Sequence, residues 1–413
     1  MKIVVLKFGG TSMATEYTRE AAVARVREAL SDNLKPVVVV SAMGRAGDPY
    51  ATDTLKSVAE NIYPHLPLRE MDLLMSCGEI IAGVVFAAAL HRAGIKAEVF
   101  TGMQAGLITD GTYGSARVVK CETGRLRHSL AAEIIPVVAG FQGATESGEI
   151  NTLGRGGSDI TAVILGAALG ASHVEIFTDV DGISTADPRL LKEARVISQL
   201  TYSEVCQLAY DGAKVIHPAA VEVAMKHNVS VKVRSLTAGG AGTLINMTGA
   251  PEPGFGVQPR EVVTGIASAA DIVQIRVDFD EPDASLEALL FEKMAAAGIS
   301  IDLISVFPRQ KFFTIKEEML PRAAAVLKGI GVSYYVEENC AKVAVVGLGM
   351  RGIPGVMARV VRALQEKGIT ILQTADSNIS IAMLIRREDL ETAVKALHDH
   401  FILGKVGENY QAG

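Results

Sequence analysis

Through the first 245 of the 413 residues, apolar strand-like segments alternate with helical patterns, and this alternation limits the possible folds more than any other feature. Short runs rich in β-branched residues, such as KIVVLKF at residues 2–8 and KPVVVVSA at residues 35–42, indicate buried strands. Segments between them, such as EYTREAAVARVREALSD at residues 16–32, have the apolar spacing of an amphipathic helix. Such alternation produces a mainly parallel sheet with helices on both faces. We therefore expect an α/β domain over residues 1–245.

The same periodicity predicts the other strands and helices of this domain. Further strands are predicted at IIPVVAGF, HVEIFTD and VSVKVRS, and further helices at EIIAGVVFAAALHRAG, DITAVILGAALGA and GAKVIHPAAVEVAMKHN.

The pattern changes after residues 246–262, a stretch rich in proline and glycine without periodicity, which we interpret as a linker. Beyond it a strand, a helix and two strands follow one another, and the same order returns about 70 residues later. AAAGISIDL in the first copy aligns with QEKGITILQ in the second. Each copy is too small to be stable alone, so we expect the two copies to pack against each other or across a dimer.

Composition narrows the class of protein. The formal net charge is −6, from 40 lysines and arginines against 46 aspartates and glutamates, without a long basic run, which argues against nucleic acid or a membrane surface as a partner. The four cysteines form no C-x-x-C pair and the eight histidines lack metal-ligand spacing, so we predict reduced thiols and no protein-held metal. The N-terminus does not have the pattern of a signal peptide, and the longest apolar runs are too short to cross a bilayer. We expect a cytoplasmic protein.

The stretch GLGMRG at residues 347–352 matches the dinucleotide fingerprint G-x-G-x-x-G, with Asp376 at the next strand. We reject a dinucleotide site on context. Only about sixty residues follow, too few for the second half of a dinucleotide-binding fold. Pro354 and Gly355 also lengthen the turn before the helix. The repeat explains the segment better, as a turn beside a small-ligand pocket.

Two other glycine-rich turns are candidate anion sites. KFGGTS at residues 7–12 follows the first strand, where Gly9 and Gly10 let consecutive N–H groups form an anion nest. A tight turn with a surface lysine, followed by a helix that Thr11 or Ser12 caps, is the alternative interpretation. LGRGGSD at residues 153–159 enters an apolar helix that its serine or aspartate could likewise cap.

Six motifs occur in the order found in aspartate kinases, and the chain resembles that family over essentially its whole length. They are KFGGTS, SCGE, GFQGA, LGRGGSD, FTDVDGISTADPR and GAKVIHP. The tail resembles the paired ACT domains of that family, and the absence of a following dehydrogenase domain is typical of its short monofunctional members. The resemblance implies ATP-dependent phosphorylation of the β-carboxylate of L-aspartate, the first step toward lysine, threonine, methionine and diaminopimelate. It also implies feedback regulation by an end-product amino acid.

The resemblance also implies the domain plan. Residues 1–245 would form an amino-acid-kinase fold, with aspartate bound by its N-terminal part and ATP by its C-terminal part. After the linker at residues 246–262, two ferredoxin-like ACT units of βαββαβ type would span residues 263–337 and 338–403. The first unit would be completed by the C-terminal segment, residues 404–413.

In this family pattern, Lys7 bridges the transferred phosphoryl group and the acceptor carboxylate, while Asp159 holds Lys7 and the substrate ammonium in place. Arg155 offers a bidentate fork to the substrate α-carboxylate. Glu79, which we expect in a loop just ahead of an apolar helix, offers an anion to the ammonium; a carboxylate stabilised by the helix dipole is the alternative. Residues 45–53 carry an insertion relative to the family, and Thr52 is the nearest match to its threonine. The other implied substrate residues are Ser41, Gly156, Gly157 and Ser158.

The implied ATP site takes its residues from three motifs. Phe8, Gly9, Gly10 and Thr11 join Lys7 at the phosphates. Thr178 and Asp179 lie near the adenine and ribose, while Ser184, Arg189 and Lys214 reach toward the phosphates. We expect Lys214 to open the helix of GAKVIHP. Mg²⁺ would arrive with ATP, held mostly by phosphates and waters, so we predict no protein ligand for it.

The repeated tail would bind the effector, which the resemblance limits to lysine, threonine or diaminopimelate. The implied residues are Ser300, Ile301 and Asp302 in the first unit and Thr370, Ile371, Asp376 and Ser377 in the second. The first unit carries DEPDAS where the family often has a Pro-Gly turn, so the two units need not bind alike. The resemblance further implies a homo-oligomer formed through the ACT domains, and a separate short regulatory subunit is possible.

Two alternatives remain open from the sequence. The first is another enzyme of the amino-acid-kinase fold, such as an acetylglutamate, glutamate or uridylate kinase, against which Arg155, Glu79 and the tail repeat argue. The second is a non-catalytic amino-acid sensor, against which Lys7, Asp159 and Lys214 argue.

Overall fold

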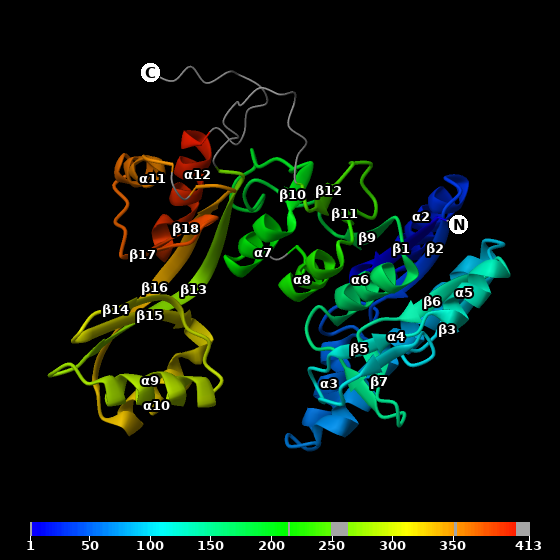
Figure 1. Cartoon of the computed structure of the whole chain (residues 1–413), viewed down its shortest axis with the longest axis horizontal. Helices are drawn as coiled ribbons and strands as arrows, with labels where there is room; N and C mark the ends of the chain where they lie inside the picture. The colour runs from blue at the N-terminus through cyan, green and yellow to red at the C-terminus, as the bar shows by residue number, and fades with distance from the viewer. Residues whose placement is uncertain (1, 214, 249–262, 351–352, 402–413) are drawn as a thin grey trace. The chain divides into compact units, whose positions relative to one another are not determined.

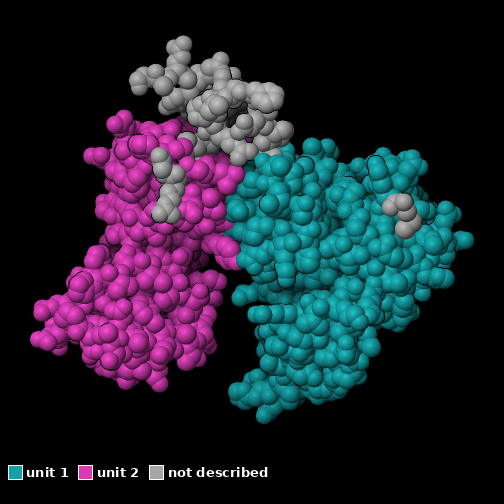
Figure 2. All heavy atoms as spheres, viewed as in Figure 1, with its two compact units in different colours: residues 1–183, 196–206, 214–252 teal, residues 184–195, 207–213, 253–413 magenta. Residues whose placement is uncertain are grey.

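The computed structural model describes residues 2–213, 215–248, 263–350 and 353–401 (Figure 1). The chain forms two compact units (Figure 2). Unit 1 takes residues 1–183, 196–206 and 214–252, and unit 2 takes residues 184–195, 207–213 and 253–413. Two short segments from the middle of the chain thus belong with the tail. The domain boundaries derived from the sequence stay a prediction, and most of the expected linker and all of residues 404–413 lie outside the described residues.

Unit 1 is built on an eight-stranded sheet with the order β10-β12-β11-β9-β1-β2-β6-β3. Its neighbouring strands are parallel except for the pair β11–β12, which confirms the predicted mainly parallel sheet. The strands are β1 (Ile3–Phe8), β2 (Lys35–Val40), β3 (Ala97–Phe100), β6 (Ile135–Ala139), β9 (His173–Thr178), β10 (Gln199–Thr201), β11 (Val231–Ser235) and β12 (Thr243–Asn246).

A second, four-stranded sheet lies in the same unit, with the order β5-β4-β7-β8. Its strands are β4 (Leu107–Thr109), β5 (Val118–Cys121), β7 (Gln142–Ala144) and β8 (Ile150–Thr152). The sequence analysis did not predict this sheet, because strands of three or four residues are too short to show periodicity.

The helices associated with unit 1 are α1 (Gly10–Ala14), α2 (Glu16–Ser31), α3 (Thr52–Glu60), α4 (Leu68–Arg92), α5 (Gly124–Ala131), α6 (Gly157–Leu169), α7 (Tyr202–Tyr210, whose last four residues belong to unit 2) and α8 (Pro218–His227). The expected helix over GAKVIHPAAVEVAMKHN begins later than predicted, at Pro218, because the His217 side chain accepts the N–H of Ala219 and caps it there. Proline is favoured in the first turn of a helix, because the backbone N–H that it lacks would have no partner within the helix there.

Helix α4 is central to unit 1. Ala82, Phe86 and Leu90 on this helix pack in one core cluster with strand residues such as Leu6 and Phe8. Among the described residues, α4 is the one helix long and apolar enough to cross a membrane, contrary to the sequence expectation. That signal is weak, because a buried core helix passes the same test, and much of α4 is buried.

Unit 2 contains a six-stranded sheet with the order β14-β15-β13-β16-β18-β17. Two long strands, β13 (Gly265–Asp278) and β16 (Ser333–Val346), are each shared by two βαββαβ units. The second half of β13 and the first half of β16 complete the first unit, with α9 (Ala284–Ala296), β14 (Asp302–Val306), β15 (Gln310–Lys316) and α10 (Leu320–Ile330). The second half of β16 and the first half of β13 complete the second, with α11 (Val356–Gln365), β17 (Gln373–Asp376), β18 (Ser380–Arg386) and α12 (Leu390–His400). The last strand of the second unit, the first half of β13, therefore precedes the whole first unit in the sequence.

The two copies have the register that the sequence alignment predicted. Gly298 after α9 and Gly368 after α11 both adopt a left-handed conformation, with φ of 69° and 71°. The next residues, Ile299 and Ile369, each donate a hydrogen bond back to the preceding helix, to Met294 and Leu364. The strand before GLGMRG lies in an antiparallel sheet, which excludes the parallel βαβ unit that a dinucleotide site requires.

Candidate active site

Lys7 lies at the carboxyl end of β1, on the face of the sheet that receives α6. Side chains alternate along a strand, so Leu6 and Phe8 point into the core formed with α2 and α4 while Lys7 points the other way. There its Nζ lies 2.7 Å from Asp159 Oδ1 on α6, and only 11% and 12% of the two side chains is exposed. The predicted Lys7–Asp159 pair is therefore formed.

Neither Ser158 nor Asp159 caps α6, which corrects the alternative raised from the sequence. Gly156 is the N-cap residue, and no side chain caps this helix. Both polar residues lie in the first turn instead. Ser158 Oγ is 2.8 Å from Ser41 Oγ, just after β2, so the two predicted substrate serines are hydrogen-bonded to each other.

Glu79 lies within α4 and not in a loop, which corrects the sequence expectation. The apolar run that predicted the helix begins at Ile80, but α4 begins eleven residues before Glu79, at Leu68. Glu79 is 2% exposed, its Oε1 accepts the N–H of Ala42 at 3.0 Å, and its Oε2 has no partner among the residues that the structure describes. Burial raises the pKa of Glu79 to about 8, against the opposing effects of the Ala42 N–H and the Lys7 charge. A buried carboxylate with a free oxygen beside Lys7 suits a ligand that brings its own positive charge.

The glycine turn after β1 packs tightly against the turn after β2. A Cβ on Gly10 would come within 2.6 Å of the carbonyl oxygens of Ala42 and Gly44, so a side chain there would force the two turns apart. Helix α1 has Gly9 as its N-cap and no side-chain cap, which means that neither Thr11 nor Ser12 caps it. Lys7 Nζ lies just above Gly9, within 3.8 Å of where a Cβ would stand. The Phe8 side chain is fully buried, which leaves only its backbone available to a ligand.

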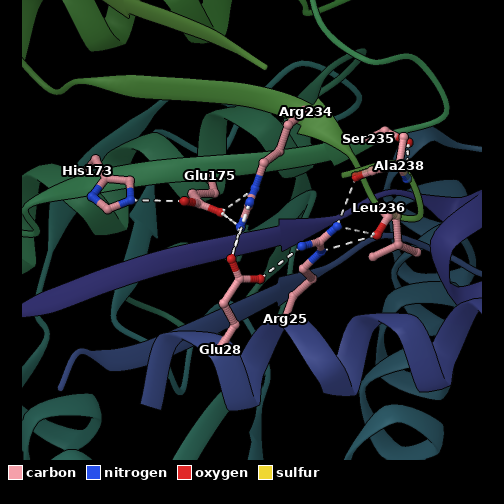
Figure 3. A network of polar contacts seen from close by, with 8 residues as sticks. All are labelled: Arg25, Glu28, His173, Glu175, Arg234, Ser235, Leu236 and Ala238. Carbon is pink, nitrogen blue, oxygen red and sulfur yellow. Dashed lines mark hydrogen bonds and ion pairs between the residues drawn. The ribbon is translucent and has the colours of Figure 1, made fainter. Parts of the chain in front are cut away.

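A polar network joins β9 and β11 to helix α2 (Figure 3). Arg234 of β11 lies between Glu175 of β9 and Glu28 of α2, with a distance of 2.8 Å to the Glu175 carboxylate. Arg25 of α2 donates to the carbonyls of Leu236 and Ala238.

Both guanidinium groups of this network also lie over the ring of Phe177, at 5.0 Å for Arg234 and 5.9 Å for Arg25. That ring stacks on Phe8 with 5.0 Å between centroids. Although burial acts to raise it, the His173 hydrogen bond and the Arg234 charge lower the pKa of Glu175. The charges of the network are internally paired, so we assign it a structural role: it holds Phe177 and Phe8, the residues next to Thr178 and Lys7.

Arg155 lies in the loop between β8 and α6, exposed, and no ion pair with it is found within the described ranges. The next residue, Gly156, has a φ of 73°, and a Cβ there would come within 2.3 Å of His217 Cβ. Glycine is therefore required at this position by both conformation and space. The LGRGGSD loop thus rests on the N-cap of α8, at the end of the GAKVIHP motif. Lys214 of that motif lies outside the described residues.

The remaining predicted residues are spread over both units. Thr52 is the first residue of α3 and half-buried. Thr178 ends β9, and Asp179 after it pairs with Arg45 of the insertion at 2.5 Å, with both side chains largely exposed. Ser184 and Arg189 belong to unit 2, where Arg189 pairs with Asp187 at 2.7 Å.

In unit 2, the structure brings the two sets of predicted effector residues near each other through Gln373 of β17. Its Nε2 donates to the Leu303 carbonyl and to Ser305 Oγ. Both acceptors lie on β14, the strand that begins at Asp302. Asp302 also pairs with the buried Lys342 at 2.6 Å. Ser377 is occupied locally, because its hydroxyl accepts N–H bonds from Ile379 and Ser380 in the β17–β18 turn. The exposed members of the set are Ser300, Asp302, Thr370, Asp376 and Ser377, while Ile301 and Ile371 are half-buried.

Magnesium was tested against the side chains present. Within the described parts of the chain, no three histidine, cysteine, aspartate or glutamate side chains converge as a metal site. A cation that arrives on phosphate oxygens fits this environment, because Mg²⁺ commonly keeps its waters and takes few protein ligands.

Sequence reasoning missed three polar residues behind the site. Asp72 and Ser76 of α4 and Gln142 of β7 are all at most 1% exposed. Gln142 Nε2 donates to the Ser76 carbonyl at 2.8 Å. The available signal was the spacing of Asp72, Ser76 and Glu79, which places three polar residues on one face of an otherwise apolar helix.

The comparisons with known proteins identify the family. A model of the amino acid kinase family matches residues 2–235, and a model of the ACT domain matches residues 335–399. The chain is 45% identical to aspartokinase 1 of Bacillus subtilis, over 98% of this chain and 100% of that protein. It is 39% identical to an aspartokinase of Geobacillus stearothermophilus, with 98% of each chain covered.

Among solved structures, that of E. coli aspartokinase III in complex with aspartate and ADP is similar to this fold. The TM-score is 0.76 at 25% identity, and the match covers 97% of this chain and all of that one.

The chain therefore belongs to the amino acid kinase family and carries an ACT-domain tail. Within that family it is an aspartokinase, an allosterically regulated phosphotransferase.

Proposed function

We propose that unit 1 transfers the γ-phosphoryl group of ATP to the β-carboxylate of L-aspartate at the carboxyl ends of β1, β2, β6 and β9. Ligands of open parallel sheets bind at this edge. The observation that carries the proposal is the buried Lys7–Asp159 pair, at 2.7 Å, beside the glycine turn of residues 9 and 10. The E. coli relative was solved with aspartate and ADP, which supports the same pair of ligands here.

The chemistry needs cations and oriented donors more than a base. The acceptor carboxylate is already ionised at neutral pH, so one of its oxygens attacks the γ-phosphorus while the bond to the ADP oxygen breaks, and no proton has to move. Lys7 offsets charge on the transferred group, and Asp159 holds the Lys7 ammonium in place. Backbone N–H groups of Gly9, Gly10 and Thr11 are offered to the phosphates. Mg²⁺, brought by ATP, would neutralise further phosphate charge.

We propose that aspartate is selected by a positively and a negatively charged side chain, Arg155 and Glu79, together with the hydrogen-bonded pair Ser41 and Ser158. Arg155 is proposed to grip the substrate α-carboxylate, because a guanidinium matches a carboxylate in a bidentate fork. Glu79 is proposed to receive the substrate ammonium with its unpartnered oxygen. Ser41 and Ser158 would exchange their mutual hydrogen bond for bonds to the acceptor carboxylate. The roles of Thr52, Gly156 and Gly157 in substrate binding, and of Phe8, Thr178, Asp179, Ser184, Arg189 and Lys214 at the nucleotide, remain predictions.

The test is ADP release that depends on both aspartate and MgATP. The variant Lys7→Met, assayed per amount of folded protein, should lower kcat by about 10³-fold, the scale of one lost transition-state cation. Lys35→Met, at a partly exposed ion pair on the same sheet, is the matched control and should retain full activity. Full activity of Lys7→Met would refute the assigned role.

We further propose that unit 2 binds an end-product amino acid near residues 300–302 and 370–377. A structure of the E. coli relative holds lysine together with aspartate, which makes lysine the first candidate ahead of threonine and diaminopimelate. Inhibition of the aspartate-dependent ADP release by each amino acid identifies the effector. Assembly through the ACT domains, a separate regulatory subunit and a cytoplasmic location remain predictions, and light scattering on the purified chain tests the first.

A further inference from the structure

A fully buried carboxylate, Asp72, lies on α4 seven residues before Glu79, outside the groups used above. It is 0% exposed and accepts three hydrogen bonds. Its Oδ2 receives the N–H groups of Gly114 and Thr152, both at 2.9 Å, and its Oδ1 receives the Thr152 hydroxyl at 2.6 Å. No cation pairs with Asp72 in the described part of the chain. A buried carboxylate without a counter-cation is costly unless such donors hold it.

These three hydrogen bonds hold two backbone segments: the residue that leads into the Arg155 loop, and the neighbouring segment against which the loop packs. Thr152 is the last residue of β8, three residues before Arg155. Gly114 lies in the neighbouring segment on which the loop rests: a Cβ on Gly154 would stand 3.3 Å from the Gly114 carbonyl oxygen. The Thr152 carbonyl accepts the N–H of Ala116 at 2.8 Å, which joins the two segments again.

The far side of the loop is held independently. Gly154 and Gly156 flank Arg155, both with positive φ, and Gly156 rests against His217. The backbone of Arg155 is thus fixed at both ends while its side chain is exposed. Because α4 also carries Glu79, one helix holds the backbone of the Arg155 loop at Asp72 and presents a carboxylate to the substrate ammonium two turns later.

We propose that Asp72 is a positioning residue that sets the affinity for aspartate by fixing the loop that carries Arg155. The proposal rests on the proposed role of Arg155 as the α-carboxylate clamp. Asp72 touches no substrate in this scheme. An Asn at position 72 can keep its amide oxygen against the two backbone N–H groups, but it loses the negative charge that strengthens these bonds and turns an NH2 group toward the Thr152 hydroxyl, so the loop base is held less firmly.

The test is steady-state kinetics of Asp72→Asn, with Glu70→Gln as the matched control, since Glu70 is a carboxylate on the same helix with 43% of its side chain exposed. We expect the KM for aspartate to rise by about tenfold, the effect of one lost charge-assisted hydrogen bond. We expect kcat and the KM for ATP to stay within about twofold, and Glu70→Gln to match the wild type. A purely structural role would lower the amount of active enzyme, and thus the apparent kcat, while leaving the KM for aspartate unchanged.

A double-mutant cycle with Arg155→Ala tests whether Asp72 acts through that residue. We expect Asp72→Asn to lower kcat/KM by no more than about twofold once Arg155 is absent. Penalties that simply multiply, or an unchanged KM in the single variant, would overturn the proposal. Thr152→Val removes one of the three donors and should show the same pattern more weakly, which keeps the test decisive if Asp72→Asn fails to fold. A wild type without aspartate-dependent activity would instead refute the proposed function.

Discussion

At the scale of single residues, the site depends on buried ionisable groups that lie close together. One of them, Glu79, has a pKa that burial shifts strongly. Its carboxyl group has an ordinary pKa of 4.5, which burial raises to about 8 in the folded protein. The folded chain therefore keeps a proton that the unfolded chain releases between these two pH values. The stability that this proton contributes is fully present below pH 4.5 and is lost as pH rises through 8.

We expect Glu79→Gln to remove this pH dependence. The free energy of unfolding of the variant minus that of the wild type should increase with pH, and at pH 9 it should exceed its value at acidic pH by about 5 kcal/mol. Denaturant titrations at a series of pH values measure the effect. Parallel curves for the two proteins would contradict the protonated state of Glu79 in the free enzyme.

Ligand binding should reverse the same equilibrium. An ammonium group placed against Glu79 favours the ionised carboxylate, so aspartate binding should release a proton from it. The KM for aspartate should therefore fall as pH rises from 6.5 toward 8.5, by up to about 25-fold if the carboxylate stays ionised in the complex. A KM that is constant over this range in the wild type would argue against the contact between Glu79 and the substrate ammonium.

At the scale of elements, the site is a meeting of turns at the carboxyl ends of parallel strands. The tightest junction is that of the β8–α6 loop with the start of α8, where Gly156 has no room for a side chain against His217. Gly156→Ala should destabilise the chain by about 2 kcal/mol or more, since it adds a clash to the roughly 1 kcal/mol cost of a left-handed alanine.

The matched control for this prediction is Gly148→Ala. Gly148 also has a positive φ, of 92°, but nothing lies within 4 Å of its added Cβ. Thermal melts of both variants, with kcat/KM for aspartate, separate the clash from the backbone cost. Equal destabilisation of the two variants would show that the contact with His217 is unimportant.

These elements also show how much could be predicted from the sequence. The central strands and helices α2 and α6 follow from periodicity, because their buried faces are long and regular. The position of Glu79 inside α4 was not predicted, because the apolar run that indicated the helix begins only at Ile80, whereas α4 begins at Leu68. Asp72 and Gln142 act through partners distant in the sequence, Thr152 and Ser76, which no local pattern reveals.

At the scale of the whole molecule, the tail is joined to segments from the middle of the chain within unit 2. Lys342 of β16, 5% exposed, pairs with Asp211 at 3.0 Å and with Asp302 at 2.6 Å. Burial by itself acts to lower the pKa of Lys342, but the two aspartates outweigh it and raise the pKa. Asp211 lies three residues before Lys214 of the proposed nucleotide site, and Asp302 belongs to the proposed effector site.

Lys342→Met should therefore leave the buried Asp211 without a cation and destabilise unit 2 by about 3 kcal/mol. It should also change the concentration of effector that halves the activity, because Asp302 loses the same partner. Lys395→Met, at an exposed lysine of α12, is the control and should alter neither quantity. An unchanged melting temperature and unchanged effector inhibition in Lys342→Met would show that these ion pairs contribute neither to stability nor to effector binding.

The central claim, that this chain phosphorylates the β-carboxylate of aspartate, is tested most directly by trapping the product. Incubation of the protein with MgATP, L-aspartate and hydroxylamine converts an acyl phosphate into a hydroxamate, whose position mass spectrometry identifies. We predict the β-hydroxamate of aspartate, formed in step with ADP and lost in Lys7→Met. ADP release without this hydroxamate, or no hydroxamate at high concentrations of folded enzyme, would contradict the account.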